Sequence, residues 1–469
     1  MEFIGRVREQ KMLIEQLSSP AQNAALIYGR RRVGKSELIL HTMRQAGKAI
    51  TIYYECRQTT EGNNTANLSE VISDAFGLPP LTFANVEAAL RFVFERALSE
   101  KTVLAIDEYP YLRDVVKGMD SILQVLLDEY RERSQLSLVL CGSYVAVMRS
   151  LLEQDNPLYG RIDLKINLQP MDYLESSLFY PERSCSDKVR LYSAFGGIPY
   201  YNRLIAPGKS VRENLINLVL QPDARLEDEV PAYLLSEVSK ISNAHEVFLA
   251  LADGQERYRD ILSQSHVSSG ATLVNVLKRL IEMQLVQRRT PINDQGNRKR
   301  TSYVICDGLT KFYYRYVFRY LSQRSVLDSE TFFDRYVADD FEQQFVPHAF
   351  EEVCRQYLVR QNRAGNIEPP FDLIGSYSYD DPVTRTNGEF DVVTRDPMGY
   401  AFYEAKFRST PITQRMIDEE IAQVQRTGLI CHRYGFFSRS GFEAKPNERT
   451  VLIGLDEMFE QEATQPYSR

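Results

Sequence analysis

Residues 29–36 read Gly29-Arg30-Arg31-Arg32-Val33-Gly34-Lys35-Ser36, which fits the pattern G-x-x-x-x-G-K-[ST]. The stretch follows the apolar run 24–28 and leads into a helical pattern over 36–45, so we expect a strand, a loop and a helix in that order. The glycines let the loop turn tightly and point its N–H groups inward. Lys35 would reach the β- and γ-phosphates of a nucleotide, and Ser36 would hold Mg²⁺. The eight residues therefore predict a loop that binds ATP.

An acidic pair follows a second apolar run. Residues 103–106 are Val-Leu-Ala-Ile, and Asp107 and Glu108 come directly after them. At the end of a buried strand, Asp107 would lie beside the Mg²⁺ ion that a nucleotide carries. Glu108 would orient a water molecule and take its proton during attack on the γ-phosphate. An acid pair at a strand end is usually a solvated loop, but its place downstream of residues 29–36 favours the functional interpretation.

Short apolar segments alternate with helical patterns in the first part of the chain. Besides 24–28, we expect strands at 49–54, 102–106 and 136–141, and helices at 36–45, 86–100 and 120–131. Such alternation is typical of a parallel sheet with helices on both faces. From 187 to 240 the pattern is mostly helical. We therefore expect an α/β fold over residues 1–235, namely a P-loop NTPase sheet with a helical lid.

Length and composition limit what the whole chain can be. Its 469 residues suffice for about three domains of roughly 150 residues each. With 56 Lys and Arg against 63 Asp and Glu, the net charge is −7. This balance argues against a protein that coats nucleic acid, but it allows local phosphate-binding patches. Six scattered cysteines fit a reducing compartment, and no apolar run is long enough to span a bilayer. We expect a cytoplasmic protein without a membrane segment.

The middle of the chain, 236–330, has the pattern of a winged helix. Two helices are expected at 257–265 and 271–284, two strands at 285–289 and 301–305, and a connecting helix at 312–324. The hairpin that these strands form is basic, and its cations are Arg288, Arg289, Arg298, Lys299 and Arg300. Such a wing could contact a DNA backbone. The alternatives are a solvated charged hairpin and a lid that binds a protein.

The tail, 331–469, gathers acidic residues on neighbouring strands. Strands are expected at 372–378, 389–395, 400–407 and 434–437, and helices at 341–359 and 415–426. Glu404 and Lys406 are two residues apart and share one face of a strand, which Asp391 on the strand before can reach. Two converging carboxylates can bind Mg²⁺ or Mn²⁺, which would activate water for phosphodiester cleavage, with Lys406 helping to position or deprotonate it. Glu351 would be a further ligand, and Gln423 would brace the site.

Several motifs together resemble a known family. In order, they are Phe3-Ile4-Gly5-Arg6 with Glu9, the loop 29–36, Leu104-Ala105-Ile106-Asp107-Glu108, Cys141-Gly142-Ser143, Pro157-Leu158-Tyr159-Gly160-Arg161 and Gly196-Gly197-Ile198-Pro199. They are similar to the archaeal-type P-loop ATPases related to the AAA and STAND classes. The resemblance implies that Gly5 and Arg6 lie near the adenine, that Ser143 is a sensor and that Arg161 is a finger or sensor arginine. A homo-oligomer is expected if Arg161 acts in trans.

The tail also fits this resemblance. A helix with Glu351, a strand with Asp391, a strand with Glu404-x-Lys406 and a second helix look like the core of PD-(D/E)XK nucleases, although Phe390 replaces the leading proline. These ATPases are often fused to such a domain. Two functions follow from the sequence. The first is an ATP-regulated, metal-dependent nuclease acting on DNA. The second is a non-cleaving ATP switch whose tail binds nucleic acid or a protein partner.

Overall fold

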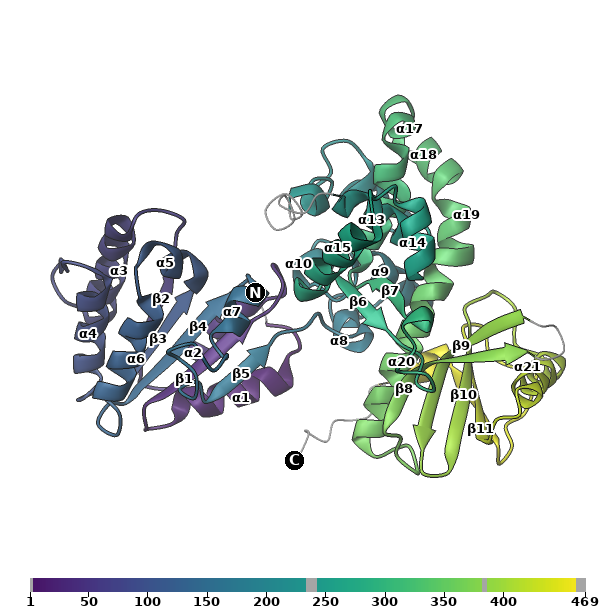
Figure 1. Cartoon of the computed structure of the whole chain (residues 1–469). Helices are drawn as coiled ribbons and strands as arrows, with labels where there is room; N and C mark the ends of the chain where they lie inside the picture. The colour runs from purple at the N-terminus through teal and green to yellow at the C-terminus, as the bar shows by residue number, and fades with distance from the viewer. Residues whose placement is uncertain (1–2, 233–242, 382–385, 461–469) are drawn as a thin grey trace. The chain divides into compact units, whose positions relative to one another are not determined.

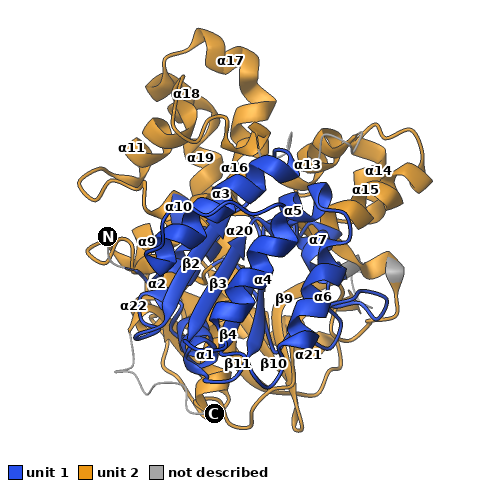
Figure 2. Cartoon of the chain, turned by 90° about the vertical axis from the view of Figure 1, so that its left-hand side faces the viewer, with its two compact units in different colours: residues 1–170, 198–200, 282–284 blue, residues 171–197, 201–281, 285–469 orange. Residues whose placement is uncertain are grey.

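The computed structural model describes residues 3–232, 243–381 and 386–460, and it divides the chain into two compact units (Figure 2). The first unit consists of Met1–Pro170, Ile198–Tyr200 and Glu282–Gln284. The second consists of Met171–Gly197, Tyr201–Ile281 and Leu285–Arg469. Of the two boundaries that the sequence suggests, 235 lies outside the described residues and 330 lies inside a helix of the second unit. The division into three domains therefore stays a prediction.

The first unit is built on a five-stranded parallel sheet with the strand order β2-β3-β4-β1-β5 (Figure 1). Its elements are α1 (Val7–Ser18), β1 (Asn23–Tyr28), α2 (Lys35–Met43), β2 (Ile50–Glu55), α3 (Glu61–Phe76), α4 (Val86–Arg96), β3 (Thr102–Asp107), α5 (Tyr109–Val115), α6 (Met119–Glu129), β4 (Leu136–Gly142), α7 (Val145–Ser150) and β5 (Leu164–Asn167). The expected parallel α/β sheet is confirmed. The edge strand β5 has no counterpart among the expected strands.

Helices cover both faces of this sheet. Along β1 the side chains alternate, so that Ala24, Leu26 and Tyr28 join the core formed with α3 to α7. Ala25 and Ile27 are buried on the opposite face, where α1 and α2 pack. Because the strands are parallel, the segments that follow β1, β3 and β4 all leave from one edge of the sheet. This edge carries the residues of the first candidate site.

Two glycines shape the loop between β1 and α2. Gly29 has φ +156°, and a Cβ there would lie 2.3 Å from the carbonyl oxygen of Leu168, which follows β5. Gly34 has φ +97° and directly precedes the first residue of α2. Neither backbone geometry suits a residue with a side chain, so the glycines allow the chain to turn from the sheet into the helix within a few residues.

The second unit has helices both before and after residues 244–305. They are α8 (Tyr173–Ser177), α9 (Cys185–Phe195), α10 (Pro199–Asn202), α11 (Val211–Leu215), η1 (Ile216–Leu220), α16 (Gly308–Phe312), η3 (Tyr313–Val317), η4 (Phe318–Tyr320), α17 (Leu321–Val326), α18 (Ser329–Tyr336), α19 (Ala338–Asp340), η5 (Phe341–Phe345) and α20 (Val346–Ala364), with the first two residues of α10 grouped with the first unit. The helix expected at 312–324 lies within a continuous helical segment, residues 308–326, but only part of that segment is α-helical. The chain passes from α16 through the π-helical turn η3 and the 3-10 turn η4 into α17, and Tyr313, Tyr314 and Tyr316 of η3 are buried.

The middle segment has the expected order of elements. It comprises α13 (Ala244–Ala252), α14 (Tyr258–Gln264), α15 (Gly270–Glu282), β6 (Val286–Arg289), η2 (Arg298–Arg300) and β7 (Ser302–Ile305). One stripe of α15 is buried, with Leu273, Val276 and Leu280 among its residues, while Val274 on the other side is exposed. The strands β6 and β7 pair antiparallel and form a hairpin.

The C-terminal part of the second unit is a five-stranded mixed sheet with the order β12-β11-β10-β9-β8. Its elements are β8 (Leu373–Asp381), β9 (Thr386–Asp396), β10 (Gly399–Lys406), α21 (Gln414–Arg426), β11 (Cys431–Ser438), β12 (Thr450–Gly454) and α22 (Leu455–Phe459). The pairs β8–β9 and β9–β10 are antiparallel, whereas β10–β11 and β11–β12 are parallel. The expected strands are confirmed, and β12 is additional. None of the helices within the described ranges is both long and apolar enough to cross a bilayer.

Candidate functional site

Lys35 is a buried cation of the loop 29–36. It is the first residue of α2 and only 5% exposed. Its Nζ donates to the carbonyl oxygens of Gly29 and Arg30, each at 3.0 Å, and to Oγ of Ser143 at 2.9 Å. The ammonium group therefore lies among oxygen atoms at the N-terminus of a helix, a place where anions bind.

Asp107 and Ser36 form a pair beside this cation. Ser36 Oγ donates to Asp107 Oδ2 at 2.5 Å, and Asp107 is 1% exposed at the end of β3. Burial alone would raise the pKa of the Asp107 carboxyl, but hydrogen bonds from the Cys141 thiol and the Ser36 hydroxyl, among others, outweigh it and hold that pKa below its usual value. The carboxylate is therefore charged at neutral pH, as a ligand for a cation must be.

Glu108 is bound to the predicted sensor residue. Its backbone is in the left-handed region, with φ +49°, and its side chain accepts hydrogen bonds from Ser143 Oγ at 2.8 Å and Ser143 N at 3.3 Å. Ser143 follows β4, so its hydroxyl connects Lys35 on one side with Glu108 on the other. The structure thus brings the residues after three different strands to one point.

These residues fit Mg²⁺ and a nucleotide. A hydroxyl and a carboxylate oxygen 2.5 Å apart are the oxygen ligands, direct or through water, that Mg²⁺ takes in nucleotide sites. Lys35 supplies a cation for the phosphates, and Gly34 leaves open space, since a Cβ there would meet only Pro199 at 3.8 Å. Ser36 and Asp107 would hold the metal, and Lys35 would hold the phosphates.

Of the two N-terminal residues predicted to lie near the adenine, Arg6 contacts the same loop. Arg6 is buried, and its Nη2 donates to the carbonyl oxygen of Val33 at 3.2 Å. The Gly5 carbonyl oxygen accepts a hydrogen bond of 2.6 Å from Gln10 of α1. The contact of Gly5 and Arg6 to adenine stays a prediction.

The three arginines of the loop have different surroundings. Arg30 is buried, whereas Arg31 is exposed. Arg32 is half-buried with φ +65°, and its guanidinium lies 4.0 Å from the centre of the Tyr200 ring. The triplet is therefore not one solvated cationic patch, and only Arg31 lies at the surface.

Arg161 has partners within the first unit. Its guanidinium donates to both carboxylate oxygens of Asp128 on α6, at 2.9 and 2.7 Å, and to the carbonyl oxygen of Pro157 at 3.0 Å. Both side chains of this ion pair are partly exposed, as in an ordinary ion pair at a protein surface. A role as an arginine finger, and the homo-oligomer that a finger in trans would need, stay predictions.

The structure adds one residue that the motifs did not include. Tyr53 on β2 donates through its hydroxyl to Asp107 Oδ2 at 2.5 Å. Burial and the neighbouring Asp107 carboxylate raise the pKa of Tyr53 far above its usual value, so the hydroxyl remains a donor. The sequence does hold a signal for it, since 49–54 is an expected strand of a parallel sheet and its polar residues reach the same edge as Asp107.

The tail places Asp391 and Glu404 on neighbouring strands. The last pair of the antiparallel register joins Val392 to Tyr403. Asp391 and Glu404 are the neighbouring residues just beyond this pair, one on each strand. Lys406 forms an ion pair with Glu404 and a second one with Glu420 on α21, with an Nζ–Oε1 distance of 3.2 Å. Burial lowers the pKa of Lys406, but the two carboxylates outweigh it and raise that pKa, so Lys406 is a firmly held cation.

The carboxylates of the tail influence one another. The residue Asp391 is exposed, yet the protein atoms around its carboxyl exclude water, which is the largest cause of a raised pKa. Repulsion from Glu351 and Glu404 adds to this effect and Arg355 opposes it, so that the pKa of Asp391 is raised to about 7. Burial also raises the pKa of Glu404. The two carboxylates are therefore close enough to repel each other, and a bound cation would reduce this repulsion.

Glu351 on α20 has other partners in this structure. It lies 3.2 Å from Nδ1 of His348 and 3.9 Å from Nη2 of Arg355. Within the described ranges no three His, Cys, Asp or Glu side chains come close enough together to hold a metal ion, so the ligand set Glu351, Asp391 and Glu404 stays a prediction. Gln423 donates to the Tyr379 hydroxyl at 2.6 Å and thereby braces β8 against α21.

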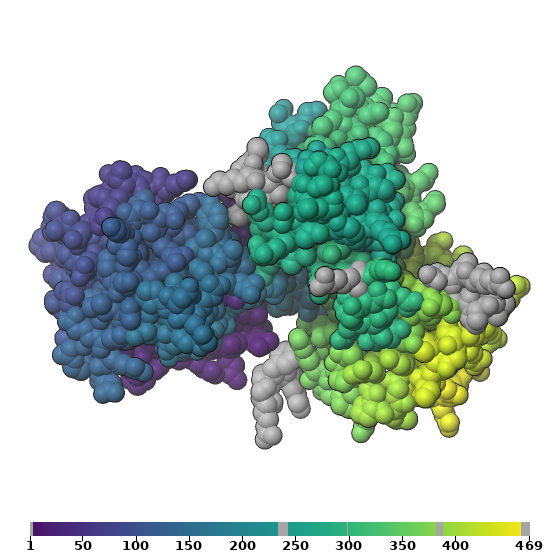
Figure 3. Space-filling view, viewed as in Figure 1, coloured from purple at the N-terminus to yellow at the C-terminus, as the bar shows by residue number. Residues whose placement is uncertain are grey.

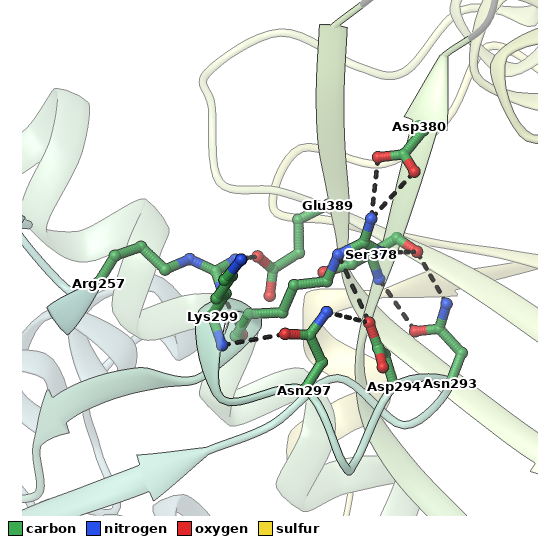
Figure 4. A network of polar contacts seen from close by, with 9 residues as sticks. Arg257, Asn293, Asp294, Asn297, Lys299, Ser378, Asp380 and Glu389 are labelled. Carbon is green, nitrogen blue, oxygen red and sulfur yellow. Dashed lines mark hydrogen bonds and ion pairs between the residues drawn. The ribbon is translucent and has the colours of Figure 1, made fainter. Parts of the chain in front are cut away.

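The basic hairpin of the middle segment is joined to the C-terminal sheet. Figure 4 shows the polar network, which links Arg257 and the hairpin turn to Ser378, Asp380 and Glu389 of β8 and β9. Asn293 donates to the Ser378 carbonyl oxygen at 2.8 Å and accepts from Ser378 N at 3.1 Å. Ile292 is buried in the core of the sheet, and in Figure 3 the green atoms of this segment lie directly against those of the sheet.

Two arginines of the predicted wing are neutralised by this docking. Arg300 pairs with Asp380 at 2.9 Å, and Arg289 pairs with Glu352 of α20 at 2.7 Å. Arg288 and Lys299 are exposed. The side chain of Arg298 lies outside the described part of the chain. Among the described wing cations, a surface for nucleic acid would therefore use Arg288 and Lys299, because Arg289 and Arg300 are engaged within the chain.

Two family models match separate parts of the chain. Residues 3–203 match a family described as an ATPase domain predominantly from Archaea, and residues 313–420 match a family of archaeal and bacterial proteins of unknown function. An uncharacterised protein of Methanocaldococcus jannaschii is 27% identical over 379 residues, which cover 80% of this chain and 81% of that protein.

Solved structures also match this chain, among them the following two. A Walker-type ATPase of Pyrococcus abyssi has a TM-score of 0.52 at 18% identity, and the match covers 67% of this chain and 96% of that one. The ORC2 protein of Aeropyrum pernix, in complexes with ADPNP and ADP, has a TM-score of 0.44 at 16% identity, covering 69% and 95%. The former similarity shows a shared fold. Residues 3–203 are thus an ATPase domain of the kind found predominantly in Archaea, and the chain continues into a C-terminal domain shared with archaeal and bacterial proteins of unknown function.

Proposed function

We propose that the first unit binds ATP with Mg²⁺ and hydrolyses it. The observation that carries this proposal is the meeting of Lys35, Ser143 and the pair Asp107-Glu108 at one edge of the parallel sheet. A buried cation, a charged carboxylate with a hydroxyl, and a second carboxylate are the three kinds of group that phosphoryl transfer to water requires.

Each residue would have a distinct part in the reaction. Lys35 would leave the Gly29 and Arg30 carbonyls and bind the β- and γ-phosphates. When bound, Mg²⁺ neutralises charge on the β- and γ-phosphates. Glu108 would accept a proton from water as the water oxygen bonds to the γ-phosphorus and the bond from that phosphorus to the bridging oxygen breaks, leaving ADP and phosphate. Ser143 would orient Glu108 and the γ-phosphate.

Nucleotide binding is tested with a fluorescent ATP analogue and full-length protein. Lys35→Ala should weaken binding by at least about tenfold, since one charge-assisted contact to phosphate is worth roughly 1.5–3 kcal/mol. Lys117→Ala, which removes an exposed lysine of the same unit, is the matched control. Equal affinities of the Lys35→Ala and Lys117→Ala proteins would overturn the proposal.

We infer a second function, a metal-dependent nuclease acting on DNA, for the C-terminal part. Support comes from the adjacency of Asp391 and Glu404, and from Lys406 held as a cation beside them. The order α20, β8, β9, β10, α21, β11 and the mixed sheet resemble the PD-(D/E)XK core. The order α14, α15, β6, β7 supports a winged-helix-like part, which would contact DNA through Arg288 and Lys299.

The alternative is a non-cleaving ATP switch whose tail binds nucleic acid or a protein. It is favoured by the docked hairpin, in which Arg289 and Arg300 already have carboxylate partners. The two functions are separated by incubation with DNA and RNA in Mg²⁺ or Mn²⁺, with and without ATP. Cleavage that disappears in Glu404→Ala but persists in the control Glu419→Ala, an exposed residue of α21, supports the nuclease. Intact substrates under every condition support the switch.

A further inference from the structure

We propose that Tyr53 positions Asp107 to receive Mg²⁺ with the nucleotide. This inference rests on the proposed ATPase function, because Asp107 matters only if the metal binds there. Tyr53 belongs to none of the motifs that mark the site, and its hydroxyl lies 2.5 Å from Asp107 Oδ2.

The fold brings Tyr53 to this place through strand pairing. In the parallel register of β2 and β3, Tyr53 lies opposite Ala105, two residues before Asp107. Its neighbours Ile52 and Tyr54 belong to the core on the side of α3 to α7, so Tyr53 points to the other face, where α2 packs. The ring is long enough to extend along the sheet to the end of β3.

Four donors contact the Asp107 carboxylate, one of which is the Cys141 thiol. Oδ2 accepts from the Tyr53 hydroxyl and from Ser36 Oγ, each at 2.5 Å, and Oδ1 accepts from the Glu108 N–H at 2.8 Å. When Ser36 turns its oxygen toward a metal, the Tyr53 hydroxyl is the remaining hydroxyl donor, and it holds the carboxylate in its orientation together with the Cys141 thiol and the Glu108 amide. Tyr53 is thus a positioning residue, since it acts on the metal only through Asp107.

The neighbouring residue offers a matched control. Tyr54 is also a buried tyrosine of β2, and its hydroxyl donates to Asn64 Oδ1 at 2.5 Å and to the Asn64 carbonyl oxygen at 3.1 Å. Removal of that hydroxyl also costs hydrogen bonds in the same strand, but on the opposite face and away from Asp107. A difference between Tyr53→Phe and Tyr54→Phe therefore reports on Asp107 and not on general loss of stability.

The experiment compares the two variants with wild type in the full chain. Affinity for a fluorescent ATP analogue is measured in EDTA and over a series of Mg²⁺ concentrations, and hydrolysis is followed over the same series. Tyr53→Phe should bind the analogue in EDTA as wild type does. It should need about three- to tenfold more Mg²⁺ for half-maximal binding and hydrolysis, the size of effect that a typical single hydrogen bond has when it acts on the metal only through Asp107. Excess Mg²⁺ should restore its hydrolysis.

The outcomes separate this inference from the function on which it rests. If wild type shows no Mg²⁺-dependent binding or hydrolysis, the proposed ATPase function fails, and the role of Tyr53 fails with it. If wild type depends on Mg²⁺ and Tyr53→Phe matches Tyr54→Phe at every concentration, only the role of Tyr53 is overturned. An Asp107→Asn background provides a second measurement, in which Tyr53→Phe should have no further effect on the Mg²⁺ dependence. An undiminished effect there would also overturn the inference.

Discussion

Single residues set the electrostatics of both candidate sites, but in opposite ways. At Asp107, hydrogen bonds outweigh burial and keep the pKa low. At Asp391, exclusion of water and repulsion from Glu351 and Glu404 raise the pKa to about 7. The carboxylate of the first site is stabilised as an anion by protein donors, whereas that of the second is destabilised until a cation or a proton arrives. The second site therefore makes the stability of the fold depend on pH.

Asp391→Asn should stabilise the protein at high pH. The native carboxyl holds its proton up to a pH of about 7, whereas the unfolded chain releases it near pH 4, so its contribution to stability is present below about 4 and is lost as pH rises through 7. Asparagine does not titrate. In EDTA at pH 8, Asp391→Asn should raise the free energy of unfolding by roughly 1 kcal/mol. This figure is smaller than the difference in pKa alone would give, because Asp391 is in contact with solvent. The gain should vanish by about pH 4.

Asp372→Asn is the control for this measurement. A hydrogen bond from Arg395 holds the pKa of Asp372 below its usual value, so removal of its charge should not stabilise the protein at pH 8. Denaturant unfolding at both pH values checks the prediction. A loss of stability in Asp391→Asn at pH 8, or a gain that is the same at pH 4, would contradict the raised pKa.

At the scale of elements, the turn of the hairpin β6–β7 packs against the edge strand β8 of the C-terminal sheet. The edge strand β8 would expose unpaired backbone groups, and the hairpin turn covers some of them through Asn293 and through a 2.8 Å bond from Ile292 N to the Ser376 carbonyl oxygen. Asn293→Ala should therefore cost about 1–2 kcal/mol and speed amide exchange along β8. The exposed Asn275→Ala on α15 should change neither. Equal exchange in the two variants would show that the turn does not brace β8.

The elements also show which features the sequence could predict. Apolar runs with flanking helices predicted β1, β3 and β4, because these strands are buried on both faces and read as continuous apolar segments. The edge strand β5, Leu164-Lys165-Ile166-Asn167, is partly exposed and too polar to stand out. The docking of the hairpin was not predicted either, since a basic turn looks the same in sequence whether it faces water or acidic residues of a distant strand.

At the scale of the whole molecule, the motifs predicted the residues of the candidate nucleotide site but not the contacts among them. Each of Lys35, Asp107, Glu108 and Ser143 could be found because a short motif marks it. The contacts from Ser143 to Lys35 and Glu108, and from Tyr53 to Asp107, join segments far apart in the chain and depend on strand order. The net charge of −7 likewise does not reveal that wing arginines are paired with carboxylates of the tail.

A single-turnover experiment with Mg²⁺ and limiting ATP decides whether this chain is an ATPase through Glu108. Glu108→Gln keeps the size of the side chain and a hydrogen bond acceptor for Ser143, but it removes the base. We expect the variant to bind Mg²⁺ and ATP as wild type does and to hydrolyse the bound ATP about 100-fold or more slowly, the usual share of a general base. Wild-type binding with no hydrolysis, or equal hydrolysis in wild type and Glu108→Gln, would contradict the proposed function.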